Sequence, residues 1–351
     1  MKRVGILGLP RSGKSTLFEI LMRGAGASSG AAAGRDQVGM VRVPDHRVDK
    51  LSALYQPKKT TYAQIQFVDT AAAGQANPRA AAKGPDLFSS VRTCDALLAV
   101  VRDFESAADP APKGVDPARD LRDLDAELVL NDLAIVENRI EKIDKELRVG
   151  KKQNEREHAL LTRCRGLLES ERPLRVETFE ADEDKTLRGF QMLTLKPLLV
   201  VVNRGEGRAH EAPETGRNAL AIALRGDLER EIVSLPPEDR EAFRAELGVP
   251  EDGLTLVIRA AYRLLGLISF FTVGPDEVRA WTVRDGDRAV DAAGEIHSDL
   301  AKGFIRAEVV PWDKLLECGG EAAARQQALL RLEGREYRVQ DGDCLEIRFN
   351  K

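Results

Sequence analysis

The stretch Val4-Gly5-Ile6-Leu7-Gly8-Leu9-Pro10-Arg11-Ser12-Gly13-Lys14-Ser15-Thr16 decides the fold of this chain. An apolar run is followed by the pattern G-x-x-x-x-G-K-[ST] and then by the helix-forming residues LFEIL. Placed between a strand and a helix, this pattern is a phosphate-binding P-loop. The backbone N–H groups of such a loop and the positive dipole end of the next helix both favour a phosphate. We therefore predict a strand–loop–helix unit that holds the phosphates of a nucleotide.

The candidate phosphate-binding residues are Gly8, Leu9, Pro10, Arg11, Ser12, Gly13, Lys14, Ser15 and Thr16. The Lys14 ammonium is expected on the terminal phosphates and the Ser15 hydroxyl on Mg²⁺. Asp69 ends the apolar run Phe67-Val68, where a P-loop enzyme needs a carboxylate near the metal, although a simple strand-end cap is the alternative. Lys14 and Asp69 are thus the candidate catalytic residues, and Ser15 and Asp69 the candidate metal ligands.

Composition sets the broad class of the protein. The 351 residues allow two or three domains, and 43% hydrophobic with 31% charged residues is typical of a soluble globular protein. A net charge of −4 gives no general nucleic-acid signature, and DNA is not an expected partner. The four cysteines lie far apart, which argues against a zinc site or a disulfide framework. We find no signal peptide or membrane span, so we expect a cytoplasmic protein without a membrane partner.

The chain is organised in three parts. Strands predicted at residues 2–7, 62–68, 96–101, 197–202 and 219–223 alternate with helical segments, which indicates an α/β domain with a parallel sheet. After a Pro/Ala-rich linker at residues 106–117, apolar residues at three/four spacing predict a two-helix hairpin, whose stripe serves helix packing or a partner. From residue 268, short strands at 270–273, 278–283, 304–310, 337–339 and 344–349 and helices at 291–301 and 321–330 predict a small mixed-sheet domain.

A second motif follows the strand at residues 197–202. GTPases recognise guanine with N-K-x-D at this place, whereas this chain has Asn203-Arg204-Gly205-Glu206. The Glu206 carboxylate is one methylene longer than Asp and cannot keep the same bidentate geometry, so guanine preference is weakened. Asn203, Arg204 and Glu206 are therefore candidate base-binding residues, with an ordinary strand-end turn as the alternative.

Together these motifs resemble the YchF/Obg-like ATPases of the Obg-related GTPase superclass over nearly the whole chain. The loop GLPRSGKSTLF, N-x-x-E in place of N-K-x-D, and the segments FFTVGPDEVRAWTV (residues 270–283) and LEGREYRVQDGDCLEIRFN (residues 332–350) are similar to that family. The resemblance implies a P-loop domain at residues 1–117 and 190–267, an inserted helical coiled-coil hairpin at 118–189 and a β-grasp TGS domain at 268–351. It also implies cytoplasmic, Mg²⁺-dependent ATP binding, with ATP preferred over GTP, slow hydrolysis, and a ribosome-associated regulatory role in translation or stress response.

Three departures from the family fall near the terminal phosphate. Residues 28–37, SSGAAAGRDQ, contain no threonine for a first switch segment, and Ala72 stands where GTPases have the glycine of D-x-x-G. The segment Arg102-Asp103-Phe104-Glu105 resembles one that family members follow with a catalytic histidine, but none follows here. Gln75 is a candidate to position water, or else a solvent-facing loop residue. Loss of a group that positions water, such as the missing histidine, costs about 10²–10⁴-fold in rate. A hydrolysis-impaired nucleotide-binding scaffold or RNA-binding adaptor is therefore the second hypothesis.

Basic residues offer two candidate surfaces for ribosomal RNA. One is the C-terminal module, with Lys302, Arg306, Arg325, Arg331, Arg335, Arg338 and Arg348, and the other is the hairpin tip at residues 148–156. Acidic residues are interspersed in the module, so a merely solvated surface explains its charge as well as RNA binding does. A solvated loop tip explains the basic hairpin tip equally well. His297 is expected to be structural or to face a partner rather than to bind a metal.

Overall fold

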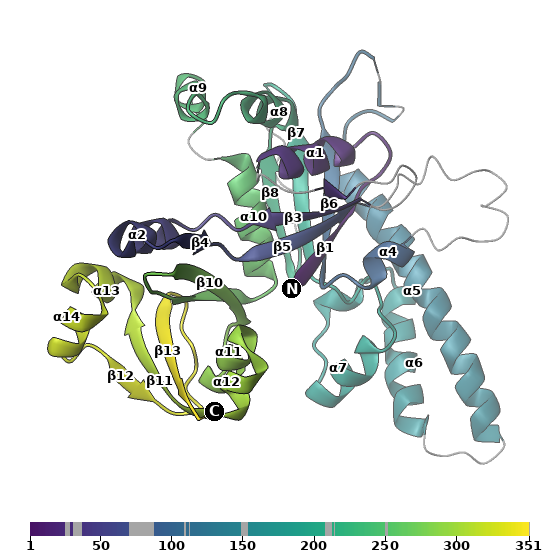
Figure 1. Cartoon of the computed structure of the whole chain (residues 1–351). Coiled ribbons are helices and arrows are strands. Elements are labelled where there is room, and N and C mark those ends of the chain that lie inside the picture. The colour runs from purple at the N-terminus through teal and green to yellow at the C-terminus, as the bar shows by residue number, and fades with distance from the viewer. Residues whose placement is uncertain are drawn as a thin grey trace. The chain divides into compact units, whose positions relative to one another are not determined.

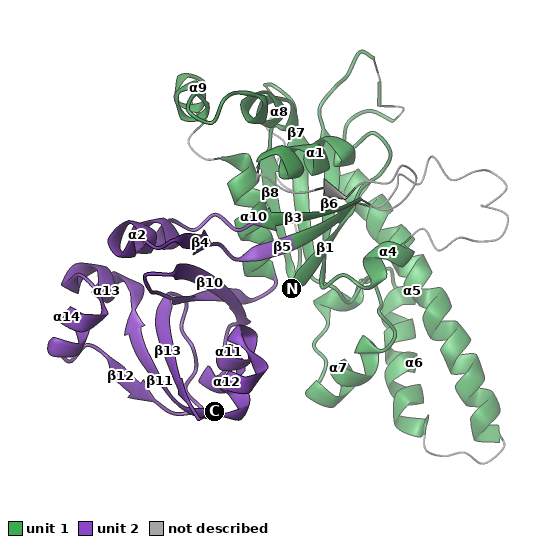
Figure 2. Cartoon of the chain, in the orientation of Figure 1, with its two compact units in different colours: residues 1–41, 66–264 green, residues 42–65, 265–351 purple. Residues whose placement is uncertain are grey.

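A computed structural model describes residues 1–24, 29–30, 37–69, 88–108, 110–111, 113–148, 154–207, 213, 215–249 and 252–350. The described residues divide into two compact units (Figure 2). The first comprises residues 1–41 and 66–264, and the second comprises residues 42–65 and 265–351. No helix in the described ranges combines the length and the apolar character needed to cross a membrane.

The first unit is built on a seven-stranded sheet in the order β2-β3-β5-β1-β6-β7-β8 (Figure 1). Pairing of β1 with β6, β6 with β7 and β7 with β8 is parallel, whereas β2 and β3 are antiparallel. Parallel strands read as continuous apolar runs because helices cover both faces, and every residue of β6 is buried. The strands are β1 (Lys2–Leu7), β2 (Ser29–Gly30), β3 (Gln37–Arg42), β5 (Gln64–Asp69), β6 (Ala96–Asp103), β7 (Leu198–Arg204) and β8 (Ala219–Leu224).

Besides the hairpin helices, the described part of this unit includes the helices α1 (Lys14–Gly24), α4 (Ser89–Arg92), α8 (Gly226–Ser234), α9 (Arg240–Glu246) and α10 (Gly253–Leu264). The predicted hairpin is confirmed as α5 (Pro117–Arg148) and α6 (Glu155–Glu169), which lie side by side in Figure 1. Its stripe is packing: Val136, Ile143 and Leu161 belong to one buried cluster, which η3 (Leu174–Val176) and α7 (Ala181–Arg188) complete.

The second unit has a six-stranded sheet in the order β12-β11-β13-β9-β10-β4. Its strands are β4 (Lys59–Thr61), β9 (Leu267–Thr272), β10 (Glu277–Arg284), β11 (Phe304–Pro311), β12 (Arg331–Glu333) and β13 (Asp343–Phe349). Its helices are α2 (His46–Tyr55), α11 (Ala289–Ile296), α12 (Ser298–Lys302), α13 (Trp312–Cys318) and α14 (Glu321–Gln326). Helix α11 contributes Ala289, Ala292 and Ala293 to a core with Phe270 and Val309 of the sheet. The predicted α/β class is therefore confirmed.

Several expected elements of the second unit differ in the structure. Residues 337–339 are not a strand but an irregular segment with one isolated bridge between Arg338 and Arg288, and the edge strand is β12. The predicted helix at 291–301 is interrupted at His297, whose extended backbone ends α11 and whose ring caps α12 by accepting from Asp299 N. His297 is therefore a helix cap.

The segment 42–65 belongs to the second unit, although the sequence analysis left it in the nucleotide domain. Its strand β4 pairs in parallel with β10, and Val48 and Leu51 of α2 are fully buried. The C-terminal sheet is thus completed by residues that lie more than two hundred positions earlier in the chain. The three-domain division drawn from the sequence stays a prediction.

Candidate functional site

The P-loop turns sharply between the end of β1 and the start of α1. Gly13 has a φ of 92°, in the left-handed region that favours glycine. A Cβ atom at Gly13 would lie only 2.1 Å from the Asn203 Nδ2 atom. Both the backbone conformation and the close approach therefore require glycine at this position, as the motif predicts.

The two candidate catalytic residues meet in a nearly buried ion pair. Lys14 Nζ lies 2.5 Å from Asp69 Oδ1, and each residue is only 8% exposed. Lys14 begins α1 and Asp69 ends β5, so the order of the sheet brings these residues together from 55 positions apart. The next loop residue, Ser15, lies exposed on the first turn of α1. The start of α1 thus supplies the Lys14 cation and the Ser15 hydroxyl, and the end of β5 supplies the Asp69 carboxylate.

Asn203 ties the P-loop to the loop after β8. Its Nδ2 atom donates to the Ser12 carbonyl at 3.1 Å, and its Oδ1 atom accepts from Gly226 N at 3.1 Å. Asn203 is buried, so both hydrogen bonds are made away from bulk water. The side chain predicted to bind a base therefore has a structural task, because it fixes two loops of the site against each other.

A cavity of about 610 Å³ extends from the P-loop over the predicted base-binding segment. It is open to solvent, and its lining combines the P-loop, the end of β6, the end of β7 and the start of α8. The lining residues are Gly13, Thr16, Phe104, Glu105, Asn203, Arg204, Gly205, Glu206, Gly226, Asp227 and Arg230. Of the residues predicted from the sequence, Gly13, Thr16, Asn203, Arg204 and Glu206 share this cavity.

The pairing of β6 with β7 holds Arg204 at the cavity wall. Asp103 and Arg204 are direct register partners, and Arg204 Nε lies 3.3 Å from the fully buried Asp103 Oδ2. Gly205 N donates to the Asp103 carbonyl at 2.8 Å, which continues the register one step beyond the strand. The Arg102 guanidinium lies 4.5 Å from the centre of the Phe104 ring. Arg204 and Phe104 thus line the cavity from positions that buried neighbours fix.

Six residues of the cavity lining were not among the predicted site residues: Phe104, Glu105, Gly205, Gly226, Asp227 and Arg230. Phe104 and Glu105 lie three and four residues after the strand predicted at residues 96–101. Gly226 and Asp227 follow β8 closely, and loops at the carboxyl ends of parallel strands converge on one edge. The position of these residues after predicted strands was therefore a usable signal, except for Arg230, which lies in the second turn of α8.

Helix α8, whose first residues line the cavity, is anchored by a buried carboxyl group. Glu229 Oε1 accepts from Gly253 N at 3.0 Å, at the first residue of α10, and burial raises the pKa of the Glu229 carboxyl. A carboxylate at a helix N-terminus also meets the positive end of the helix dipole. Glu229 therefore joins the starts of α8 and α10.

Comparison with known proteins assigns the chain to a family. A family model described as "YchF-GTPase_C: Protein of unknown function (DUF933)" matches residues 267–350. The chain is 39% identical to "Ribosome-binding ATPase YchF" of Bacillus subtilis, covering 99% of this chain and 98% of that protein. It is 34% identical to the protein of the same name from Escherichia coli O157:H7, with 99% of each covered. The chain belongs to the YchF family.

A solved structure agrees with this assignment. The "Structure of the Schizosaccharomyces pombe YchF GTPase" matches with a TM-score of 0.84 and 27% identity, covering 99% of this chain and 97% of that one. The resemblance drawn from the sequence motifs, and the fold class that came with it, are thereby confirmed.

Several features noted in the sequence lie outside the described residues of this YchF-family chain. They are Ser28, residues 31–36, Ala72, Gln75 and residues 149–153 of the hairpin tip. Of the histidines that are described, His158 pairs with Asp144 on the hairpin, and His46 and His297 belong to the second unit. None of these three lines the cavity.

The basic residues of the second unit are largely paired with their own neighbours. Arg325 and Arg348 both contact the Glu308 carboxylate, Arg331 lies near Glu333, and Lys302 lies near Asp299. Arg335 and Arg338 donate to the backbone carbonyls of Phe304 and Gly286. Six of the seven residues considered for phosphate contact thus have internal partners, which favours the interpretation as a solvated surface.

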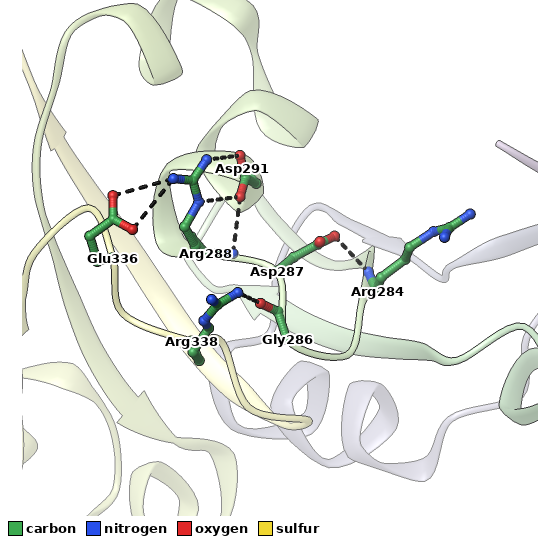
Figure 3. Close-up of polar contacts among 7 residues, drawn as sticks. All are labelled: Arg284, Gly286, Asp287, Arg288, Asp291, Glu336 and Arg338. Carbon is green, nitrogen blue, oxygen red and sulfur yellow. Dashed lines mark hydrogen bonds and ion pairs between the residues drawn. The ribbon is translucent and has the colours of Figure 1, made fainter. Parts of the chain in front are cut away.

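Figure 3 shows the same pairing at the corner between β10 and α11. Arg288 Nε lies 2.9 Å from Asp291 Oδ2, and Arg288 Nη1 lies 3.3 Å from Glu336 Oε1. Hydrogen bonds to Asp291 and then to Glu336 raise the pKa of the Arg288 guanidinium. These ion pairs hold Glu336 and the loop that carries it against Arg288 and Asp291 at the start of α11.

Proposed function

We propose that this chain is a Mg²⁺-dependent P-loop ATPase that prefers ATP over GTP and hydrolyses it slowly. The observation that carries the proposal is the single cavity that runs from Gly13 and Thr16 of the P-loop to Asn203 and Glu206. The triphosphate would lie on the P-loop, and the base would lie between Phe104 and the Asn203–Glu206 segment. Titration of the full chain with fluorescent ATP and GTP analogues, with and without Mg²⁺, tests this directly.

The residues at the phosphate end suit a magnesium-bound triphosphate. The Ser15 hydroxyl and the Asp69 carboxylate would supply an oxygen-only set of ligands, which Mg²⁺ prefers, with further ligands expected from phosphates and water. The bound metal would neutralise charge on the phosphate oxygens. Lys14 would exchange its ion pair with Asp69 for the phosphates, and the P-loop N–H groups would orient them. Lys14→Ala is therefore expected to weaken nucleotide binding strongly. Because it also removes the ion-pair partner of Asp69, thermal unfolding of the variant is measured alongside binding.

ATP preference rests on the length of the Glu206 side chain. Guanine presents two adjacent donors that suit the carboxylate of a shorter aspartate, and a misplaced carboxylate loses part of this bidentate contact. Glu206→Asp should raise affinity for GTP relative to ATP, with the summed change in the ratio on the order of tenfold. Glu206→Gln is the control that removes the charge at constant length and should not favour GTP.

Slow hydrolysis is proposed because no described residue that lines the cavity is a histidine. The segment Arg102–Glu105, which family members follow with a catalytic histidine, continues here into Ser106 and Ala107. Single-turnover hydrolysis by this chain should be slower than that of a histidine-containing relative measured beside it. Equal rates would refute the proposed impairment. Binding of Mg²⁺–ATP with no turnover at all would favour the second candidate, a nucleotide-binding scaffold or RNA-binding adaptor.

A ribosomal partner is proposed from the relatives, which carry the name "Ribosome-binding ATPase YchF". Such a partner implies action in the cytoplasm as a regulatory switch, and contact with ribosomal RNA. Because most basic residues of the second unit are internally paired, we do not assign the contact to that surface. Cosedimentation of the chain with ribosomes, with and without ATP, tests this part independently of nucleotide binding.

A further inference from the structure

The segment 42–65 has an unusual position in the chain. It is folded into the second unit, yet both of its ends continue as strands of the first unit's sheet, β3 before it and β5 after it. Figure 2 shows β5 coloured as part of both units. Each of these two connections is therefore a strand rather than a free linker.

One end of β5 lies at the proposed phosphate site. Asp69, its last residue, holds Lys14 at 2.5 Å in the nearly buried pair described above. A phosphate ligand with its metal would compete for both members of this pair. Water screens the attraction between these two nearly buried charges only little. Separating Lys14 from Asp69 therefore removes a strong force on the end of β5 that carries Asp69.

The other end of β5, at Gln64, leads directly into the second unit. The carbonyl of Ala63 accepts from Val43 N at 2.8 Å, which ties the two connections together. Two residues earlier, Thr61 Oγ1 donates to Glu277 Oε1 at 2.6 Å and forms part of the β4–β10 pairing. Only seven residues of chain, 62–68, thus separate Asp69 from an edge strand of the second sheet.

The two elements of the segment are held with very different strength. Helix α2 has two fully buried residues, Val48 and Leu51, and Arg47 pairs with both Asp45 and Asp341. Strand β4 has three residues at the sheet edge, and the ion pairs Lys58–Asp276 and Lys59–Glu277 lie at the surface and contribute little. Short exposed pairings open at low free-energy cost. If β5 moves, β4 is the element that yields.

We propose that nucleotide binding in the first unit loosens the β4–β10 edge of the second unit through β5. The inference rests on the proposed nucleotide binding. Loosening is the available direction because β4 is already paired along its whole length while Lys14 and Asp69 are in contact. The chain thus contains a connection by which the nucleotide state changes the C-terminal module, with α2 as the fixed point.

Hydrogen exchange on the full chain tests the response of the edge. The amides of Lys58 and Lys59 donate to the carbonyls of Pro275 and Asp276. Their exchange should become faster when saturating Mg²⁺–ATP is added, whereas the amides of α2 should keep their protection. Unchanged or slower exchange at residues 58–61 would overturn the proposal.

Nucleotide affinity supplies the reciprocal test, because coupling between two sites acts equally in both directions. Thr61→Ala removes one hydrogen bond of the β4–β10 edge, so it should lower the Kd for Mg²⁺–ATP by roughly two- to tenfold. Arg288→Gln, which removes ion pairs of the same unit outside segment 42–65, is the matched control and should leave the Kd unchanged. An unchanged Kd in Thr61→Ala, or equal shifts in both variants, would remove the coupling alone. A wild-type chain that binds no nucleotide would remove the proposed function as well.

Discussion

Replacement of Asn203 by alanine is the most direct test of how the candidate site is assembled. The side chain makes two buried hydrogen bonds at 3.1 Å, one to the Ser12 carbonyl and one from Gly226 N. A typical hydrogen bond contributes about 0.5–1.5 kcal/mol net, so loss of both costs about 1–3 kcal/mol. If this cost falls on the conformation that binds nucleotide, the Kd rises by roughly 5- to 150-fold.

The assay is titration of the Asn203→Ala chain with a fluorescent ATP analogue, alongside thermal unfolding. Asn218→Asp is the control, because Asn218 Nδ2 also donates to a backbone carbonyl at 3.1 Å, that of Arg175, but outside the cavity. Asp also tolerates the left-handed backbone of residue 218, whose φ is 54°. The control should lose stability and keep its Kd. If Asn203→Ala lowers the melting temperature but binds nucleotide as tightly as wild type, the reasoning is refuted.

Three further predictions concern the first unit. Gly13→Ala should lower nucleotide affinity more than tenfold, since alanine is strained at a φ of 92°; a Kd within twofold of wild type would contradict this. The Glu229 carboxyl has a pKa raised by burial above 4.5, so the folded state binds its proton more tightly than the unfolded state does. The stability of wild type relative to Glu229→Gln should therefore fall as pH rises from 4.5 towards neutral in urea unfolding, and parallel pH profiles would contradict it. Removal of Mg²⁺ with EDTA should weaken ATP binding by at least tenfold, because the metal then no longer offsets the repulsion between the Asp69 carboxylate and the phosphates; calorimetry with and without metal measures the change.

Much of the first unit could be predicted from local sequence. The apolar runs that became β1, β6 and β7 are buried parallel strands, and such strands have a composition that is readable without knowledge of their partners. The hairpin could be predicted because its apolar residues recur at helical spacing over many turns. The P-loop and Asn203 were found because each follows such a strand directly.

The second unit was less predictable because its contacts are distant or polar. Strand β4 has the sequence KTT, without apolar alternation, and its partner β10 begins at Glu277. Residues 337–339 suggested a strand by their β-branched and aromatic content, but Tyr337 donates to the buried Asp343 carboxylate and Val339 N donates to the Asp287 carbonyl. Composition could not indicate which basic residues are paired, since pairing depends on which strands become neighbours.

The Lys14–Asp69 pair links the chemistry of the site to its architecture. Two charges this close to full burial are stable only when each is compensated, and here each compensates the other. On the proposed function, a phosphate ligand alone would draw Lys14 away from Asp69 and bring more negative charge beside it, whereas a metal-bound nucleotide supplies opposite charge to both residues at once. The proposed function therefore predicts that the metal complex binds in preference to the free nucleotide. The proposed binding is thus independent of the rate of hydrolysis, because the proposed exchange of the ion pair uses Lys14 and Asp69 and requires no water-positioning group.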